Sequence, residues 1–147
     1  MPIEYRILRA GDEALLASAA ADVFDDPVLL QAVREFLSDP RHHLAAAIED
    51  QVVIGFASGV HYVHPDKAHP EFWINEVGVA PAFQNHGIGK ALMRAMLVVA
   101  SELGCKEAWV LTERNNTPAM RLYQSLGGSE AADETVMFSF NLDTDLS

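Results

Sequence analysis

The sequence predicts a mixed α/β fold in which helices pack against a central sheet. Segments with the two-residue alternation of strands and segments with the apolar spacing of helices follow one another along the chain. The expected order is strand, helix, helix, three strands, helix, strand, helix, strand, which indicates a mixed sheet. Hydrophobic residues make up 50% of the 147 positions, enough for the core of one domain spanning residues 1–147.

The first segments are predicted to be one strand followed by two helices. Residues Glu4–Arg9 alternate in the manner of a strand. Asp12 is then expected to cap a helix over Ala14–Val23, whose apolar positions share one face. The Asp-Pro pair at 26–27 fits an N-cap followed by proline at the first helical position, and helical spacing then continues up to Pro40, which predicts a second helix.

The middle of the chain changes to strand periodicity. His43–Glu49 and Gln51–Tyr62 are predicted to be strands joined by a tight turn at residues 50–51. A loop follows over Val63–Pro70, and Glu71–Val79 is the third strand of this group.

The last third returns to alternating helices and strands. Ile88–Leu103 carries a continuous apolar stripe and is predicted to be a long helix ended by a glycine. Glu107–Thr112 is an expected strand, Pro118–Leu126 a helix, and Thr135–Leu142 a last strand.

Charge and composition narrow the function classes. The formal net charge is -11, and the acids concentrate before residue 51 and after residue 128. A nucleic-acid partner is not expected, because its binding surface would be basic. The acidic flanks either steer a cationic partner or only keep the protein in solution.

Cys105 alone supports neither a disulfide framework nor a multi-cysteine zinc site. The histidines predict no metal site, and no apolar run reaches membrane-spanning length, so a cytoplasmic protein is expected.

One stretch, NEVGVAPAFQNHGIGK at residues 75–90, combines a strand, a loop, two glycines and a helix start. Gly87 and Gly89 allow a ligand to approach the backbone without a side chain in the way. The first amides of a helix lack intrahelical partners and carry partial positive charge, which suits a pyrophosphate. Taken alone, the pattern also fits a plain tight turn.

A wider pattern surrounds this stretch. Gln84–Gly89 resembles the Q/R-x-x-G-x-G/A loop of the GNAT N-acetyltransferase superfamily, and Asn116–Gly127 resembles its N-x-x-A-x-x-L-Y-x-x-L-G element. One predicted helix and one predicted strand separate the two elements, as in that fold. The resemblance, which covers about residues 74–128, implies a mostly antiparallel sheet flanked by helices and acetyl-coenzyme A (acetyl-CoA) as cofactor.

The resemblance also implies a set of cofactor-binding residues. The pantetheine arm is expected along the strand at Val77, Gly78 and Val79, and Asn116 is expected to contact the same arm. The pyrophosphate is expected at Gln84, Asn85, His86, Gly87, Ile88, Gly89 and Lys90. The family loop often carries arginines, whereas here positive charge must come from Lys90, from protonated His86 or from the helix dipole.

Acetyl transfer to an amine needs a base and a proton donor. We predict Glu76 as the base, acting directly or through a water molecule, with His61 and His64 as alternatives. By resemblance, Tyr123 lies near the sulfur and is predicted to protonate the departing thiolate; the alternative is a tyrosine that only packs in the core.

Within the superfamily the chain resembles the type I aminoglycoside 3-N-acetyltransferases. EFWINEVGV at residues 71–79 is similar to that group's E-I-Y-I-Y-D-L-A-V, and ETVMF at 134–138 to its E-E-V-M-H-F, with Glu76 in place of aspartate. The resemblance implies a small cationic amine as acceptor and an acidic cleft. The carboxylates expected in that cleft are those of Asp25, Asp26, Glu35 and Glu134.

Alternative functions stay open. The acceptor can instead be a polyamine, another small amine or a protein N-terminus, or the chain can be a module that binds coenzyme A (CoA) without transferring acetyl. A homodimer is also expected, because many relatives pair and the predicted strand Thr135–Leu142 can add to the sheet of a partner.

Overall fold

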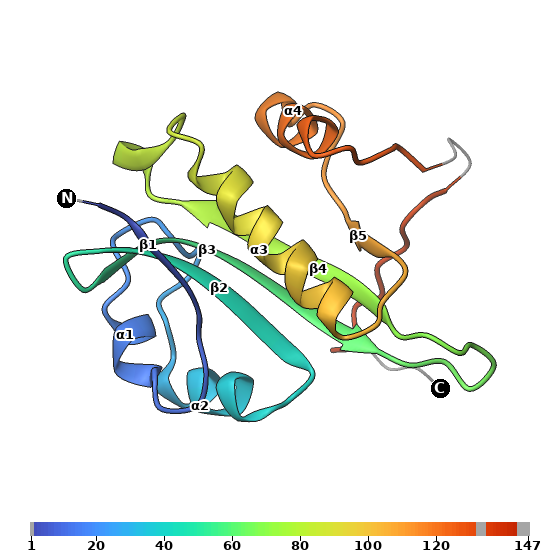
Figure 1. Cartoon of the computed structure of the whole chain (residues 1–147), viewed down its shortest axis with the longest axis horizontal. Coiled ribbons are helices and arrows are strands. Elements are labelled where there is room, and N and C mark those ends of the chain that lie inside the picture. Colours follow the sequence, from blue (N-terminus) through green and yellow to red (C-terminus); the bar gives the residue numbers. More distant parts are fainter. Residues whose placement is uncertain (1, 132–134, 144–147) are drawn as a thin grey trace.

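The computed structural model describes residues 2–131 and 135–143, and the described part is built around one five-stranded sheet (Figure 1). Its strands are β1 (Glu4–Ile7), β2 (His42–Glu49), β3 (Val52–Tyr62), β4 (Glu71–Val79) and β5 (Ala108–Val110). They lie side by side in chain order, and every neighbouring pair is antiparallel except β4 and β5, which are parallel. This confirms the predicted mixed, mostly antiparallel sheet.

Helices cover both faces of the sheet. They are α1 (Glu13–Ala17), α2 (Leu30–Ser38), the short 3-10 helix η1 (Pro81–Phe83), α3 (Ile88–Glu102) and α4 (Thr117–Ser125). α3 lies along one face, with α4 beside its first half, while α1 and α2 lie on the other face (Figure 1). None of the described helices is long and apolar enough to cross a membrane.

The sheet separates two hydrophobic cores. The α3-side core includes Phe72, Ile74, Ile88, Leu92 and Met96. The α1/α2-side core includes Leu16, Val33, Leu44, Val53 and Phe56. Neighbouring strand residues supply opposite cores because successive side chains point to opposite faces of a sheet.

The β2–β3 hairpin forms as predicted. Glu49 pairs with Val52, so the loop has only two residues. Asp50 and Gln51 both have positive φ values, 50° and 65°. Positive φ at both central residues is the type I′ geometry that fits the twist of a two-residue hairpin.

A β-bulge interrupts β4 at Asn75. Ile74 pairs with Gly59 and Glu76 pairs with Ser58, so Asn75 has no opposite residue on β3. In a regular strand Ile74 and Glu76 would share the α3 face, because they are two residues apart. The extra residue instead turns Glu76 to the α1/α2 face, beside the side chain of Ser58.

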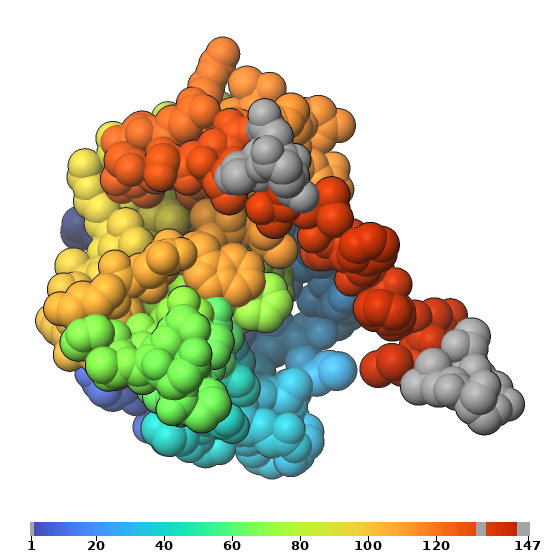
Figure 2. Space-filling model, turned by 90° about the vertical axis from the view of Figure 1, so that its right-hand side faces the viewer, coloured from blue at the N-terminus to red at the C-terminus, as the bar shows by residue number. Residues whose placement is uncertain are grey.

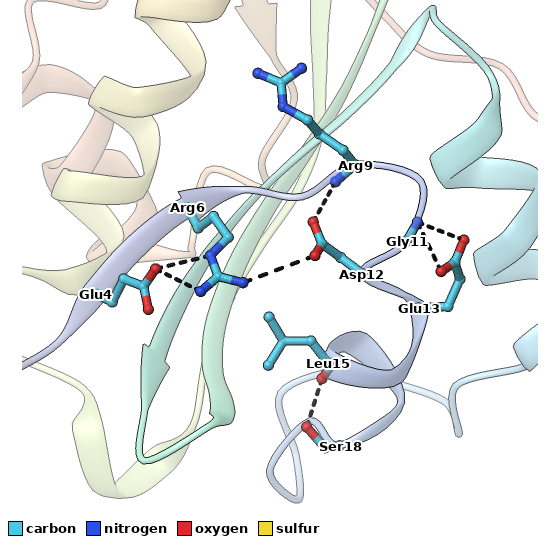
Figure 3. Close-up of polar contacts among 8 residues, drawn as sticks. All are labelled: Glu4, Arg6, Arg9, Gly11, Asp12, Glu13, Leu15 and Ser18. Atoms are coloured by element: carbon cyan, nitrogen blue, oxygen red, sulfur yellow. Dashed lines mark hydrogen bonds and ion pairs between the residues drawn. The ribbon is translucent and has the colours of Figure 1, made fainter.

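The first helix differs from the prediction at its start. Asp12 occupies the N-cap position, but its carboxylate does not cap α1. It accepts a hydrogen bond from the Arg9 amide at 2.8 Å and lies 4.0 Å from the Arg6 guanidinium, which also pairs with Glu4 (Figure 3). The side chain therefore fastens the end of β1 to the start of α1.

The first helix also ends six residues before the predicted limit. The hydroxyl of Ser18 donates hydrogen bonds to the carbonyls of Leu15, at 2.7 Å, and Gln51, at 3.2 Å. The Ala20 amide then donates to Val53 on β3 at 2.9 Å. Because these contacts join the chain to the β2–β3 hairpin, residues 18–29 run across the sheet as a loop and the prediction of a helix up to Val23 is wrong.

Two further predictions need correction. α2 begins at Leu30, so Asp26 does not cap it, because residues 27–29 run as loop against the α1/α2-side core through Val28. Residues 135–143 contain no strand, so the predicted strand Thr135–Leu142 is wrong for this chain on its own. A strand needs a neighbour to complete its hydrogen bonds, and no described strand pairs with this segment, which projects from the body of the molecule (Figure 2).

Candidate active site

A gap opens in the sheet between β4 and β5. The two strands pair only at Phe72–Ile74 against Ala108–Val110. After Val110 the chain leaves the sheet toward α4 (Figure 1). On the side of β4 that faces β5, the backbone of residues 75–79 thus has no described strand beside it. Unpaired backbone groups on such an edge can bind an extended ligand by strand-like hydrogen bonds.

The loop after β4 is held by its own side chains. The Gln84 amide donates to the Val79 carbonyl at 3.2 Å, and Nδ1 of His86 lies 3.1 Å from the Phe83 carbonyl. Asn85, between them, has a φ of 64°. These contacts fix the entry into α3 from β4.

The start of α3 fits a pyrophosphate group. Gly87 is its N-cap with a φ of 78°, and a Cβ added there would meet no atom within 4 Å. A Cβ on Gly89 would meet only Leu122 Cδ2, at 3.5 Å. The first turn contains no acid and does contain Lys90, so its free amides and positive charge face an uncrowded backbone.

Asn116 begins α4 on the same side of the sheet. Its Oδ1 accepts a hydrogen bond from the Ala119 amide at 3.2 Å, which caps the helix. The cap uses the oxygen of the side chain, so the amide nitrogen can still donate to a ligand. The predicted contact with the cofactor arm is therefore compatible with a structural role.

A pocket of about 330 Å³ lies on the opposite face, between the α1–α2 connection, α2 and the sheet. Carboxylates of Asp25, Asp26 and Glu76 line it, together with the largely apolar side chains of α2 and β3. Of the other predicted cleft residues, Glu35 lies outside this lining and hydrogen-bonds Gln31 at 3.2 Å. Glu134 lies outside the described residues.

Gly78 positions one wall of this pocket. A Cβ there would come within 2.5 Å of the Val23 carbonyl oxygen and 2.9 Å of the Phe56 ring. Phe24 stacks on the same ring, with 4.1 Å between the ring centroids. The loop that carries Asp25 therefore rests directly on the β4 backbone. The sequence analysis assigned Gly78 to cofactor binding and did not predict this close approach of the loop. A glycine inside a strand is the sequence feature that could have indicated it.

Tyr123 lies on the α3 side of the sheet, on the face opposite to the pocket that Glu76 lines. It projects from α4 and packs against the α3-side core. Burial raises the pKa of its phenol, so the group stays protonated at neutral pH and can donate a proton. Glu76 and Tyr123 thus lie on opposite faces of the sheet.

The two histidines considered as bases are engaged elsewhere. Nδ1 of His61 lies 2.8 Å from Nε2 of His43, next to the ring of Phe72 in the α3-side core. Burial and the neighbouring His61 lower the pKa of His43 to about 4. Nε2 of His64 lies 2.7 Å from a Glu71 oxygen. Neither histidine lines the acidic pocket, whereas Glu76 does.

Comparison with known proteins identifies the family. Residues 12–128 match the model of the Acetyltransferase (GNAT) family, and the chain belongs to this family. Its members use acetyl-CoA, so the predicted enzyme class, an N-acetyltransferase, and the predicted cofactor are confirmed.

Several curated relatives share the family but differ in acceptor. The chain is 33% identical to an aminoglycoside N(6')-acetyltransferase type 1 of Salmonella typhimurium, over 65% of this chain and 68% of the relative. It is 29% identical to the N-alpha-acetyltransferase RimI of Mycobacterium tuberculosis, over 86% and 78%. It is 39% identical to a mycothiol acetyltransferase of Pseudarthrobacter chlorophenolicus, over 60% of this chain but only 28% of that longer protein.

Solved structures confirm the fold. An aminoglycoside acetyltransferase from an uncultured soil metagenomic sample, in complex with sisomicin, superposes with a TM-score of 0.81 at 18% identity, covering 95% and 96% of the two chains. The aminoglycoside N-acetyltransferase AAC(6')-Iy in complex with CoA gives 0.76 at 23% identity, covering 96% and 95%. The AAC(6')-Iy and Salmonella typhimurium enzymes are named for the 6'-amine, not for the 3-amine that the sequence resemblance implied.

Proposed function

We propose that this protein transfers acetyl from acetyl-CoA to a primary amine of an aminoglycoside. The observation that carries the proposal is the position of Glu76. It lies in an acidic pocket on one face of the sheet, beside the gap whose other face leads to the α3 start and Tyr123. Acceptor and cofactor can therefore approach from opposite faces and react directly in a ternary complex.

Each of these residues has a separate role in the proposed acetyl transfer. Acetyl-CoA supplies the acetyl group as a reactive thioester. Glu76 takes the proton that the acceptor amine loses, directly or through one water molecule. A backbone amide on the open edge of β4 stabilises the negative charge that develops on the carbonyl oxygen. Tyr123 gives its phenol proton to the leaving sulfur, and the start of α3 holds the diphosphate.

The negative charge of the pocket favours a cationic acceptor. Three carboxylates around about 330 Å³ attract a compact polycation and place its amine near Glu76. The aminoglycoside relatives support this acceptor class. Which amine reacts, the 3-amine or the 6'-amine, stays a prediction, as do the cytoplasmic location and the absence of a nucleic-acid partner.

The function is tested by release of free thiol from acetyl-CoA. The assay compares sisomicin with spermidine and with a peptide bearing a free N-terminus. We expect release with sisomicin, and mass spectrometry with fragmentation locates the acetyl on one amine. Release with only another acceptor contradicts the aminoglycoside assignment, and CoA binding without release from any acceptor favours a binding module.

We further infer that the chain forms a homodimer through its C-terminal segment. This segment carries five apolar side chains that are each at least 70% exposed: Val136, Met137, Phe138, Phe140 and Leu142. A second copy can cover such an apolar segment, whether by pairing at the β5 edge or by packing.

We expect light scattering to give twice 16.1 kDa for the wild type. The double substitution Phe138→Ser and Phe140→Ser should give 16.1 kDa, whereas Val98→Ser, at an exposed apolar position on α3, should stay dimeric. A monomeric wild type contradicts this inference.

A further inference from the structure

Two stacked tryptophans lie where β4 and β5 pair. Trp73 on β4 and Trp109 on β5 are register partners, and their rings stack with centroids 5.0 Å apart and planes 7° apart. They are the two tryptophans of the chain. Trp73 is 36% exposed, which is high for a large apolar side chain in the interior of a sheet.

The bulge at Asn75 brings this pair next to Glu76. Trp73 lies between Phe72 and Ile74, which both enter the α3-side core, so its side chain points to the α1/α2 face. Its partner on β3 is Val60, two residues from Ser58, the partner of Glu76. Two residues along a strand span about 7 Å. Trp73 and Glu76 therefore lie on the same face of the sheet, opposite β3 positions that are two residues apart, and Glu76 is the one of them that lines the pocket.

Polar contacts hold the pair in place. The indole nitrogen of Trp109 donates to the Tyr62 hydroxyl at 2.8 Å. Tyr62 pairs in register with Glu71, whose carboxylate lies 2.7 Å from Nε2 of His64. A binding surface whose rings are already fixed loses little conformational freedom when a ligand arrives.

The surroundings define the chemistry of a ligand for this surface. The adjacent pocket is acidic, and an indole attracts a cation to its π-face while its carbon surface packs against the apolar face of a sugar ring. A ring that carries ammonium groups satisfies both features. A linear polyamine lacks the ring, and a single-ring amine held at Glu76 does not reach about 7 Å further.

We propose that Trp73 and Trp109 form a distal acceptor subsite that binds a second amino-sugar ring while the reacting amine lies at Glu76. The acceptor is then a multi-ring polycation. This inference rests on the proposed function, because it uses the same acceptor pocket, but its binding test does not depend on turnover.

Tryptophan emission provides the binding test, because both tryptophans of the chain belong to the pair. Sisomicin titrated into the protein saturated with CoA should change the emission in a saturable way. The single-ring amine deoxystreptamine should change it little at the same occupancy of the pocket, which competition with sisomicin measures.

Kinetics provide the second test. Trp73→Ala should raise the KM for sisomicin about tenfold and leave kcat within about twofold, while the KM for deoxystreptamine stays unchanged. Trp73→Tyr should restore most of the loss, since it keeps an aromatic face. Val63→Ala, at an exposed apolar position after β3, is the matched control and should change neither constant. Thermal unfolding and the Kd of CoA verify that each variant is folded.

The outcomes separate the two proposals. No emission change at saturating sisomicin overturns the subsite, whether or not sisomicin is acetylated. An equal rise in KM for both acceptors also overturns it, because Trp73 would then act on the reacting ring. Saturable emission change without acetylation supports the subsite and contradicts only the proposed function.

Discussion

Glu76→Gln is expected to lower kcat by about 100-fold or more while the KM for acetyl-CoA stays within about twofold. The amide is nearly isosteric with the carboxylate but cannot accept the proton of the acceptor amine, and removal of a general base typically costs about 100- to 10,000-fold in rate. Steady-state kinetics with sisomicin over a range of pH measure the effect. The acidic limb of the kcat profile, which reports the base, should disappear with the substitution.

Matched variants separate this role from a general charge effect. Glu102→Gln removes an equal charge from the exposed end of α3 and should leave both constants unchanged. Because Glu76 is exposed, Glu76→Gln should change the free energy of unfolding by less than about 0.5 kcal/mol. Tyr123→Phe should lower kcat without removing the acidic limb. If Glu76→Gln and Tyr123→Phe both leave turnover unchanged, the proposed mechanism is wrong even if the protein is an acetyltransferase.

Gly78→Ala is expected to destabilise the fold by about 1–3 kcal/mol and to weaken acceptor binding. The added methyl group would lie 2.5 Å from the Val23 carbonyl oxygen, and a backbone atom cannot move aside as a flexible side chain can. The loop that carries Asp25 and Asp26 must therefore lift from β4. Urea unfolding measures the stability, and the KM for sisomicin measures the change in the pocket.

Gly89→Ala is the matched stability control for this prediction. Its methyl group would meet only Leu122 Cδ2 at an ordinary 3.5 Å, inside the first turn of α3. Alanine is a better helix former than glycine by about 0.5–1 kcal/mol, so the variant should be as stable as the wild type or more stable. Equal stability of the Gly78→Ala protein and the wild type would contradict the close packing of the loop on β4.

Several features of the protein could be predicted from neighbouring residues alone. The limits of β4, the long helix α3 and the two-residue turn at Asp50 and Gln51 agree with the sequence analysis. Each depends on a local property, namely side-chain alternation, an apolar stripe of helical period or the tolerance of a turn for positive φ. The loop before α3 belongs to the same group, because its glycines and the helix start are consecutive in the chain.

Features that depend on distant residues could not be predicted. Asp12 was expected to cap a helix that continues to Val23. Its carboxylate instead contacts Arg6, and the contact of Ser18 with the hairpin at Gln51 ends the helix early. Asp26 was expected to cap α2, but it lies in the loop that lines the pocket. In each case tertiary contacts outweigh a local preference of about 1 kcal/mol.

Motifs and periodicities within short segments were enough to specify the family, the cofactor and most of the order of the elements. The shared pocket of Glu76, Asp25 and Asp26 depends instead on long-range packing, because one extra residue at Asn75 reverses the side on which the Glu76 carboxylate emerges. The same holds for Thr135–Leu142, which alternates like a strand but is not one within a single chain. A strand forms only where another strand completes its backbone hydrogen bonds, and a short segment does not encode its partner.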